Sequence, residues 1–177
     1  MAHIEVDKTI AGIRSLFMFR PETGKPLTDL AQVLLRGSSP LSTAERELIA
    51  AYVSHLNECS FCMNSHASAA RCLYGNEEAL VDDVLTDIQQ SGVSEKMKAL
   101  LNIAALVQVS GKSVTPSDID AARKAGAGDM DIHDTVLIAA AFSMFNRYVD
   151  GLAAFTPKNR EDYLAMGKRM AESGYIF

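Results

Sequence analysis

Three side chains with redox and proton-transfer chemistry lie close together in the stretch ERELIAAYVSHLNECSFCMNSHASAARC, residues 45–72. Cys59, Cys62 and His66 are spaced i, i+3 and i+7, so on a helix they share one face. A Cys-x-x-Cys pair can close a disulfide with little backbone movement. An imidazole one turn after the second sulfur can take or return a proton. The spacing therefore favours a dithiol redox site, with Cys59 at a helix start where the macrodipole favours a thiolate.

Two other interpretations of the cysteines stay open. In the first, small buried sulfurs fill a core, which suits Cys72 among its alanine and leucine neighbours but does not account for the Cys-x-x-Cys spacing. In the second, Cys59, Cys62 and His66 bind a metal, with Glu47 or His55 as a fourth ligand. Structural zinc sites normally take a second ligand pair from a separate knuckle, and the sequence offers none. We expect no metal and no organic cofactor in the chemical step.

Helix signals recur along the whole chain, and strand alternation does not. Ser42, with Glu45 three residues later, forms a capping box before an apolar stripe. Gly75 is a typical C-terminal stop, and Thr115-Pro116 is a typical start. Residues 19–26 are expected to be extended. The predicted helices cover residues 27–37, 42–58, 59–75, 76–92, 94–111, 115–126 and 129–155, and a weaker helix follows from residue 159.

These elements predict an all-α fold, a single compact domain over residues 1–177 with seven or eight helices. The redox core is expected at about 42–110. A chain of 177 residues with 48% hydrophobic side chains can bury a core without disulfides. Broad apolar faces on residues 97–109 and 136–145 indicate a homo-oligomer.

Composition excludes several classes of protein. The net charge is −5 and no lysine or arginine cluster is present, so nucleic acid is not an expected partner. The longest apolar run, 136–142, is too short to cross a membrane, and the acidic start does not resemble a signal peptide. We therefore expect a cytoplasmic protein in a reducing compartment, where a Cys-x-x-Cys pair is more often catalytic or metal-binding than structural.

Glu47, eleven residues, then Cys59-x-x-Cys62-x-x-x-His66 resembles the signature of AhpD-like alkylhydroperoxidases of the carboxymuconolactone decarboxylase superfamily. The segments GIRSLFMFRPETGKPL and FNRYVDGLA also resemble the branch called uncharacterised peroxidase-related enzymes. The resemblance covers most of the chain. The four-residue signature is far more specific than a lone Cys-x-x-Cys.

The resemblance implies an all-helical peroxidase that assembles as dimers, trimers or hexamers. In such enzymes the second cysteine, here Cys62, attacks the hydroperoxide, and Cys59 resolves the sulfenic acid into a disulfide. Glu47 and His66 form a proton relay. The disulfide is reduced by an external thiol donor, in the best-known relatives by a lipoyl-carrying protein. The alternative functions are a general disulfide oxidoreductase or a non-catalytic redox-sensing or metal-binding module.

One position departs from the family pattern. Members with peroxidase activity often carry a histidine directly before the second cysteine, where this chain has Phe61. An apolar ring there is expected to raise the pKa of the thiols. His55 either compensates or is a surface histidine. The polar cluster in FNRYVDGLA either lines a substrate entrance or subunit contact, or serves for capping and salt bridges; its members are Asn146, Arg147, Tyr148 and Asp150.

Overall fold

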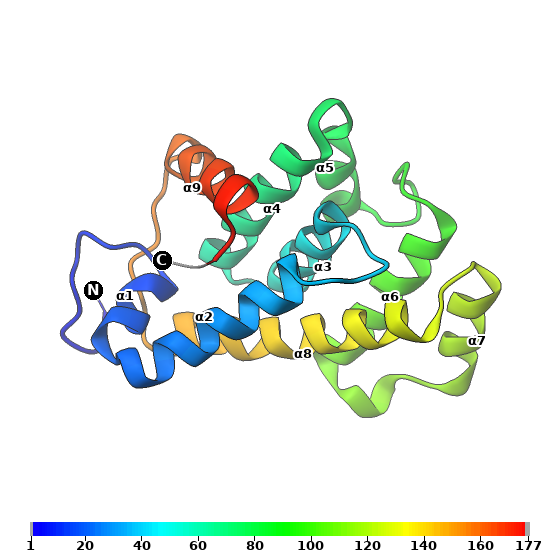
Figure 1. Ribbon diagram of the computed structural model, residues 1–177, viewed down its shortest axis with the longest axis horizontal. Helices are drawn as coiled ribbons and strands as arrows, with labels where there is room; N and C mark the ends of the chain where they lie inside the picture. The colour runs from blue at the N-terminus through cyan, green and yellow to red at the C-terminus, as the bar shows by residue number, and fades with distance from the viewer. Residues whose placement is uncertain (1, 176–177) are drawn as a thin grey trace.

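Helices supply the regular structure over residues 2–175, the part of the chain described by the computed structural model (Figure 1). The all-α prediction is confirmed. The prediction of seven or eight helices is wrong, because this part of the chain forms nine α-helices and two short 3-10 turns. They are α1 (Ile13–Phe19), α2 (Pro21–Arg36), α3 (Thr43–Leu56), α4 (Ser60–Tyr74), η1 (Gly75–Glu77), α5 (Ala79–Thr86), α6 (Glu95–Val109), η2 (Gly111–Ser113), α7 (Pro116–Lys124), α8 (Asp129–Gly151) and α9 (Arg160–Ser173).

The error lies in the first part of the chain, where no helix was predicted over Ile13–Phe19 and residues 19–26 were expected to be extended. Pro21 instead occupies the first position of α2, where its missing N–H costs nothing. Pro26 lies inside α2 and leaves the carbonyl of Glu22 without its helical donor. Both residues are exposed, so water can hydrate that carbonyl. Gly24 packs directly on Phe17 of α1, since an added Cβ would lie 2.5 Å from the Phe17 carbonyl oxygen.

The predicted boundaries around the cysteines are confirmed. The Ser42–Glu45 capping box forms in both directions and opens α3. Cys59 is the N-cap residue of α4, and Gly75 ends α4 with φ 59°. The helix predicted over 76–92 is shorter than expected, because α5 ends at Thr86 and the chain then turns.

α3 lies in the middle of the fold and packs against α4, α6 and α8 (Figure 1). On the far side of α4 lies α9, and Gly167 of α9 makes this approach close: a Cβ there would lie 2.3 Å from Ser68 Oγ. α6, predicted to have a broad apolar face, is covered by α3, α7 and α8 within the same domain. Most buried apolar side chains form one core around these helices.

A second, smaller apolar cluster contains both cysteines of the Cys-x-x-Cys pair. Its other buried members are Leu16, Phe61, Val149, Ala154 and Tyr163. They come from α1, α4, α9, the end of α8 and the segment that follows it. The pair is thus enclosed by elements distant in sequence. No helix within residues 2–175 combines the length and the apolar character needed to span a bilayer.

Candidate active site

A tight turn between α3 and α4 places the predicted site residues on neighbouring helices. Glu58 adopts φ 57°, and the Cys59 N–H donates to the Ser54 carbonyl at 3.0 Å. Small side chains let the two helices approach closely, which brings Glu47 of α3 beside His66 of α4. The fully buried alanines of these helices are Ala50, Ala51, Ala67, Ala69 and Ala70.

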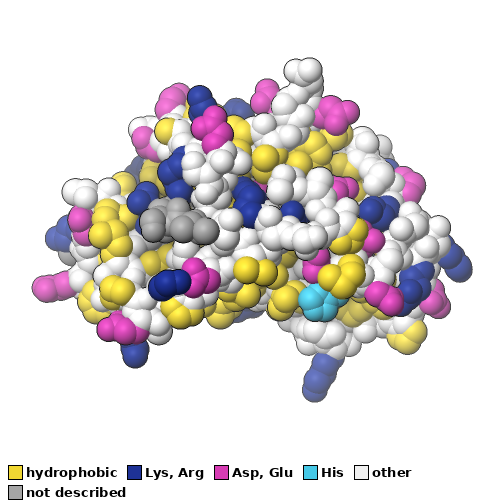
Figure 2. All heavy atoms as spheres, in the orientation of Figure 1, with side chains coloured by type: hydrophobic (Ala, Val, Ile, Leu, Met, Phe, Trp, Pro, Cys, Tyr) yellow, Lys and Arg dark blue, Asp and Glu magenta, His cyan; other side chains and the backbone are white. Residues whose placement is uncertain are grey.

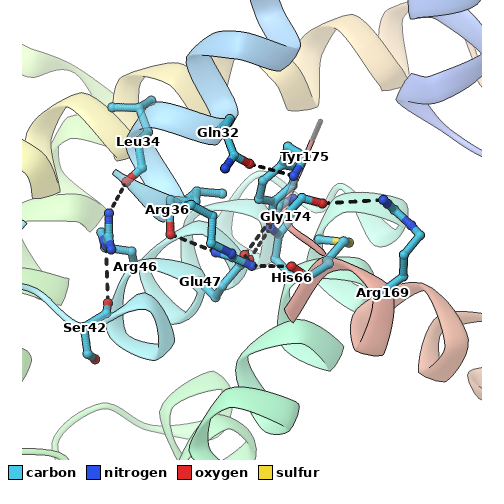
Figure 3. A network of polar contacts seen from close by, with 12 residues as sticks. Gln32, Leu34, Arg36, Ser42, Arg46, Glu47, His66, Arg169, Gly174 and Tyr175 are labelled. Atoms are coloured by element: carbon cyan, nitrogen blue, oxygen red, sulfur yellow. Dashed lines mark hydrogen bonds and ion pairs between the residues drawn. The ribbon is translucent and has the colours of Figure 1, made fainter. Parts of the chain in front are cut away.

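Glu47 and His66 form a buried pair (Figure 3). His66 Nδ1 lies 2.7 Å from Glu47 Oε2, and the two residues are 8% and 0% exposed. The other carboxylate oxygen of Glu47, Oε1, takes two further donors. Arg36 Nη2 lies 2.6 Å from it, and the Tyr175 hydroxyl donates to it at 2.5 Å. Each of the four side chains comes from a different element: α2, α3, α4 and the segment after α9.

These donors decide the charge of Glu47. Burial alone raises the pKa of this carboxyl group, but the charge and hydrogen bond of His66, the charge of Arg36 and the Tyr175 hydrogen bond outweigh it, and the pKa is lowered. Glu47 is therefore ionised at neutral pH. Burial and the adjacent Glu47 charge raise the pKa of Tyr175 well above its usual value, so the phenol stays a donor.

An ionised Glu47 also fixes the orientation of His66. A carboxylate only accepts hydrogen bonds, so Nδ1 of His66 carries a proton and Nε2 is the nitrogen available for proton exchange. His66 and Cys62 line one small cavity of about 50 Å³, together with Phe61, Phe142 and Tyr175. The Phe142 ring packs edge-on against His66 with a centroid distance of 4.5 Å.

Cys59 and Cys62 are free thiols, and both are buried. The hydrogen bond with Cys59, burial and the charge of Cys59 raise the pKa of Cys62 well above the usual value. This direction agrees with the expectation drawn from Phe61. Cys62 therefore rests as a thiol and needs a base before it can act as a nucleophile.

Asn146 of α8 connects the cysteines to the polar interior. It is 1% exposed, donates to Ser54 Oγ at 3.0 Å and accepts from Asn57 Nδ2 at 2.9 Å. Its side chain also hydrogen-bonds Cys62, which lowers the pKa of that thiol against the stronger opposing effects. Asn146 is thus an internal residue of the site, neither a helix cap nor a surface contact.

Asp150 lies one turn beyond Asn146, at the Cys59 end of the pair. Burial raises the pKa of Asp150, and a hydrogen bond from Cys59 partly offsets this effect. Asp150 also lines a surface cleft of about 490 Å³, together with Val149 and Ala154, which both pack in the cysteine cluster.

Three other His and Cys residues lie outside the site. His55 is exposed, so it is a surface histidine. Cys72 is exposed, so its interpretation as core filler is wrong: six residues beyond His66, it lies on the solvent side of α4. His133 is exposed and pairs with Asp134 at 3.0 Å. Within residues 2–175, no three His, Cys, Asp or Glu side chains are grouped so that they could hold a metal ion.

Sequence reasoning missed Arg36 and Tyr175. Arg36 ends an amphipathic helix, where a basic residue is ordinary. Tyr175 lies 109 positions from His66, and no local pattern relates the two. Asn146 was noted as polar within an apolar helix, and that contrast was the available signal.

Residues 21–86 match the model of the carboxymuconolactone decarboxylase family. This range includes Glu47, Cys59, Cys62 and His66. A search of curated proteins found no match.

Solved structures with the same fold include an uncharacterised peroxidase-related protein from Silicibacter sp. TM1040. It has a TM-score of 0.78 and 26% identity, over 88% of this chain and 79% of that one. A second, an alkylhydroperoxidase AhpD core protein from Ralstonia eutropha JMP134, has a TM-score of 0.79 and 22% identity over 90% and 82%. A third, from Agrobacterium tumefaciens, is a protein of unknown function linked by name to AhpD and antioxidant defence. It has a TM-score of 0.69 and 21% identity over 81% and 97%. The last two likenesses concern the fold alone.

Proposed function

We propose that this chain is an AhpD-like member of the carboxymuconolactone decarboxylase superfamily and a thiol-dependent peroxidase. It reduces hydroperoxides with the dithiol of Cys59 and Cys62. The observation that supports this most is the buried Glu47–His66 pair, because its histidine lines the same cavity as Cys62. A thiol with a raised pKa requires such a base nearby.

In the first step, Cys62 transfers its proton to His66 Nε2, and its sulfur attacks one peroxide oxygen. The O–O bond breaks, Cys62 becomes a sulfenic acid, and the leaving alkoxide takes the proton back from His66 as an alcohol. The peroxide is reduced by two electrons and the sulfur is oxidised by two. Glu47 stays ionised throughout and stabilises the transient imidazolium, as a triad carboxylate does.

In the second step, the Cys59 sulfur attacks the sulfenic sulfur, a disulfide forms, and water leaves with the Cys59 proton. The position of Cys59 at the N-cap of α4, three residues before Cys62, supports this pairing. An external dithiol, of the lipoyl type, then reduces the disulfide and is itself oxidised. The chemical steps need no metal or organic cofactor.

The proposal includes a cytoplasmic, homo-oligomeric protein: a dimer, trimer or hexamer. Met130, Leu137 and Met144 of α8 are 53%, 39% and 44% exposed. Their spacing of seven residues gives one stripe along the helix, and Figure 2 shows exposed hydrophobic side chains over the α2 and α8 side of the molecule. Such a stripe is typical of a helix that packs against another subunit.

The test measures hydroperoxide consumption by purified protein with dihydrolipoamide or thioredoxin as the donor. Cys62→Ser should abolish consumption, and Cys59→Ser should stop after one turnover with a trappable sulfenic acid on Cys62. Cys72→Ser is the matched control and should retain full activity, because Cys72 is exposed and outside the site. A Cys62→Ser protein as active as wild type would show that the roles are assigned wrongly.

A second candidate is a general disulfide oxidoreductase. The observation that favours it is Phe61 directly before Cys62, where family members with peroxidase activity often carry a histidine, while the Cys59–Cys62 dithiol that exchange requires is present. This function predicts that the purified protein exchanges disulfides with dithiol substrates at a rate that exceeds its peroxide turnover. The same assay, run with a disulfide in place of the peroxide, distinguishes the two.

A further inference from the structure

Cys62 and His66 are almost completely buried, and the cavity beside them is small. Cys62 is 3% exposed and His66 is 8% exposed. The two small cavities that touch His66 have volumes of about 50 and 60 Å³. A single water needs roughly 10–15 Å³ of cavity volume, whereas a site for a drug-sized molecule occupies about 300 Å³ or more. A group of a few atoms fits beside Cys62, and a bulky hydroperoxide or a lipoyl group does not.

Tyr175 belongs to the wall of both cavities. Its ring stacks on His66 with a centroid distance of 6.0 Å and an angle of 16°. It also packs under the Arg36 guanidinium, 5.2 Å from the ring centroid. Figure 3 shows Tyr175 over the Glu47–His66 pair, on the side from which α2 approaches.

Hydrogen bonds to α2 and α3 hold Tyr175 in place, and its hydroxyl also lies 3.3 Å from His66 Nδ1 of α4. Its hydroxyl donates to Glu47 Oε1 at 2.5 Å, and its backbone N–H donates to Gln32 Oε1 at 2.8 Å. Both acceptors belong to other helices, α3 and α2. The first bond is charge-assisted and therefore about twice as strong as a neutral one.

The segment that carries Tyr175 lies beyond the end of α9. α9 ends at Ser173, and the chain turns at Gly174 with φ 69°, a conformation that favours glycine. If Tyr175 swings out, Glu47 keeps Arg36 and His66 as partners. An unpaired buried charge is the usual obstacle to such a movement, and opening leaves none.

We propose that Tyr175 determines access and specificity at this site. Residues 174–175, here called the lid, cover the Cys62 cavity. The hydrogen bonds of Tyr175 to Glu47 and Gln32, here called the latches, hold the lid in this position. With the lid closed, only small hydroperoxides reach Cys62. Bulky hydroperoxides and the dithiol donor require the lid to open. This inference deepens the proposed peroxidase function and rests on it for the substrates, while the lid itself is testable without turnover.

The test compares alkylation of reduced protein by a small reagent, iodoacetamide, and a bulky one, N-phenylmaleimide, with each cysteine followed by mass spectrometry. Both reagents consume thiolate, so the ratio of their rates cancels any change in the pKa of Cys62 and reports access alone. Exposed Cys72 is the internal control. The variants are Tyr175→Ala, which removes the lid side chain, and Tyr175→Phe and Gln32→Ala, which each remove one latch but keep the ring.

At Cys62 the bulky-to-small ratio should rise at least tenfold in Tyr175→Ala. It should rise about tenfold in Tyr175→Phe, because loss of a charge-assisted hydrogen bond changes an equilibrium by about tenfold or more, and less in Gln32→Ala. The ratio at Cys72 should not change. Peroxidase assays should show a parallel rise in kcat/KM for cumene hydroperoxide relative to hydrogen peroxide.

An unchanged ratio at Cys62 in all three variants would overturn the proposal. A rise of the Cys62 ratio in Tyr175→Ala but in neither latch variant would also overturn the proposal, because Tyr175 would then be a fixed wall of the cavity. If the alkylation ratios change as expected but the wild-type protein consumes no hydroperoxide with any donor, the proposed function fails and the lid stands.

Discussion

The Arg36–Glu47 ion pair offers the sharpest test of the buried network. Arg36→Met removes the guanidinium 2.6 Å from Glu47 Oε1 and keeps an unbranched apolar stem. Glu47 is 0% exposed, so its charge loses a partner that water cannot replace. Removal of one member of a buried pair costs about 3–5 kcal/mol. Because Tyr175 and His66 still donate to Glu47, we expect the free energy of unfolding to fall by about 3 kcal/mol at pH 7, the lower end of this range.

The loss should depend on pH in a defined direction. The pKa of Glu47 is lowered in the folded protein, so the stability it contributes is present above the pKa of the unfolded chain, about 4.3, and is lost as pH falls through the folded value. Without Arg36, less positive charge opposes the effect of burial, so the pKa of Glu47 rises. The difference in unfolding free energy between wild type and variant should therefore narrow on acidification once Glu47 protonates in the variant, and should stop narrowing once Glu47 protonates in the wild type as well.

Urea unfolding of both proteins between pH 4 and pH 8 measures this gap. Arg71→Met is the matched control: Arg71 pairs with Asp82, whose side chain is 59% exposed, and the expected loss is at most about 1 kcal/mol. Arg36→Met combined with Glu47→Gln should recover part of the stability, since the unpaired charge is then gone. A loss below 1 kcal/mol, or a gap that does not change with pH, would refute this account of the network.

Two further outcomes follow from the site. Alkylation of Cys62 by iodoacetamide should be slower at pH 7 than alkylation of Cys72, and should keep rising above pH 9, because the pKa of Cys62 is raised; a plateau for Cys62 near pH 8 would contradict this. Gly12→Ala should cost about 2–4 kcal/mol in thermal or urea unfolding, because Gly12 has φ 56° and an added Cβ would lie 2.0 Å from the Phe61 ring; a loss under 1 kcal/mol would show that Phe61 moves freely.

Most helices could be predicted because their signals are local. The capping box at Ser42 and Glu45, the stop at Gly75 and the apolar period of α8 each depend on a few neighbouring residues. Residues 19–26 were predicted wrongly because their two prolines suggested an extended segment. In the fold, Gly24 packs against α1 and this segment is helical. That contact is tertiary, and no pattern within the segment reveals it.

For the site itself, the spacing of Cys59, Cys62 and His66 was enough to put three reactive groups on one helix face, since helical geometry relates residues a few positions apart. Only the tertiary structure decided the electrostatics of that face. Arg36 and Tyr175 reach Glu47 from α2 and from the segment after α9, and together with His66 they keep a fully buried carboxylate ionised. The charge of such a group depends on every donor within a few ångströms, and those donors come from parts of the chain that meet only when it folds.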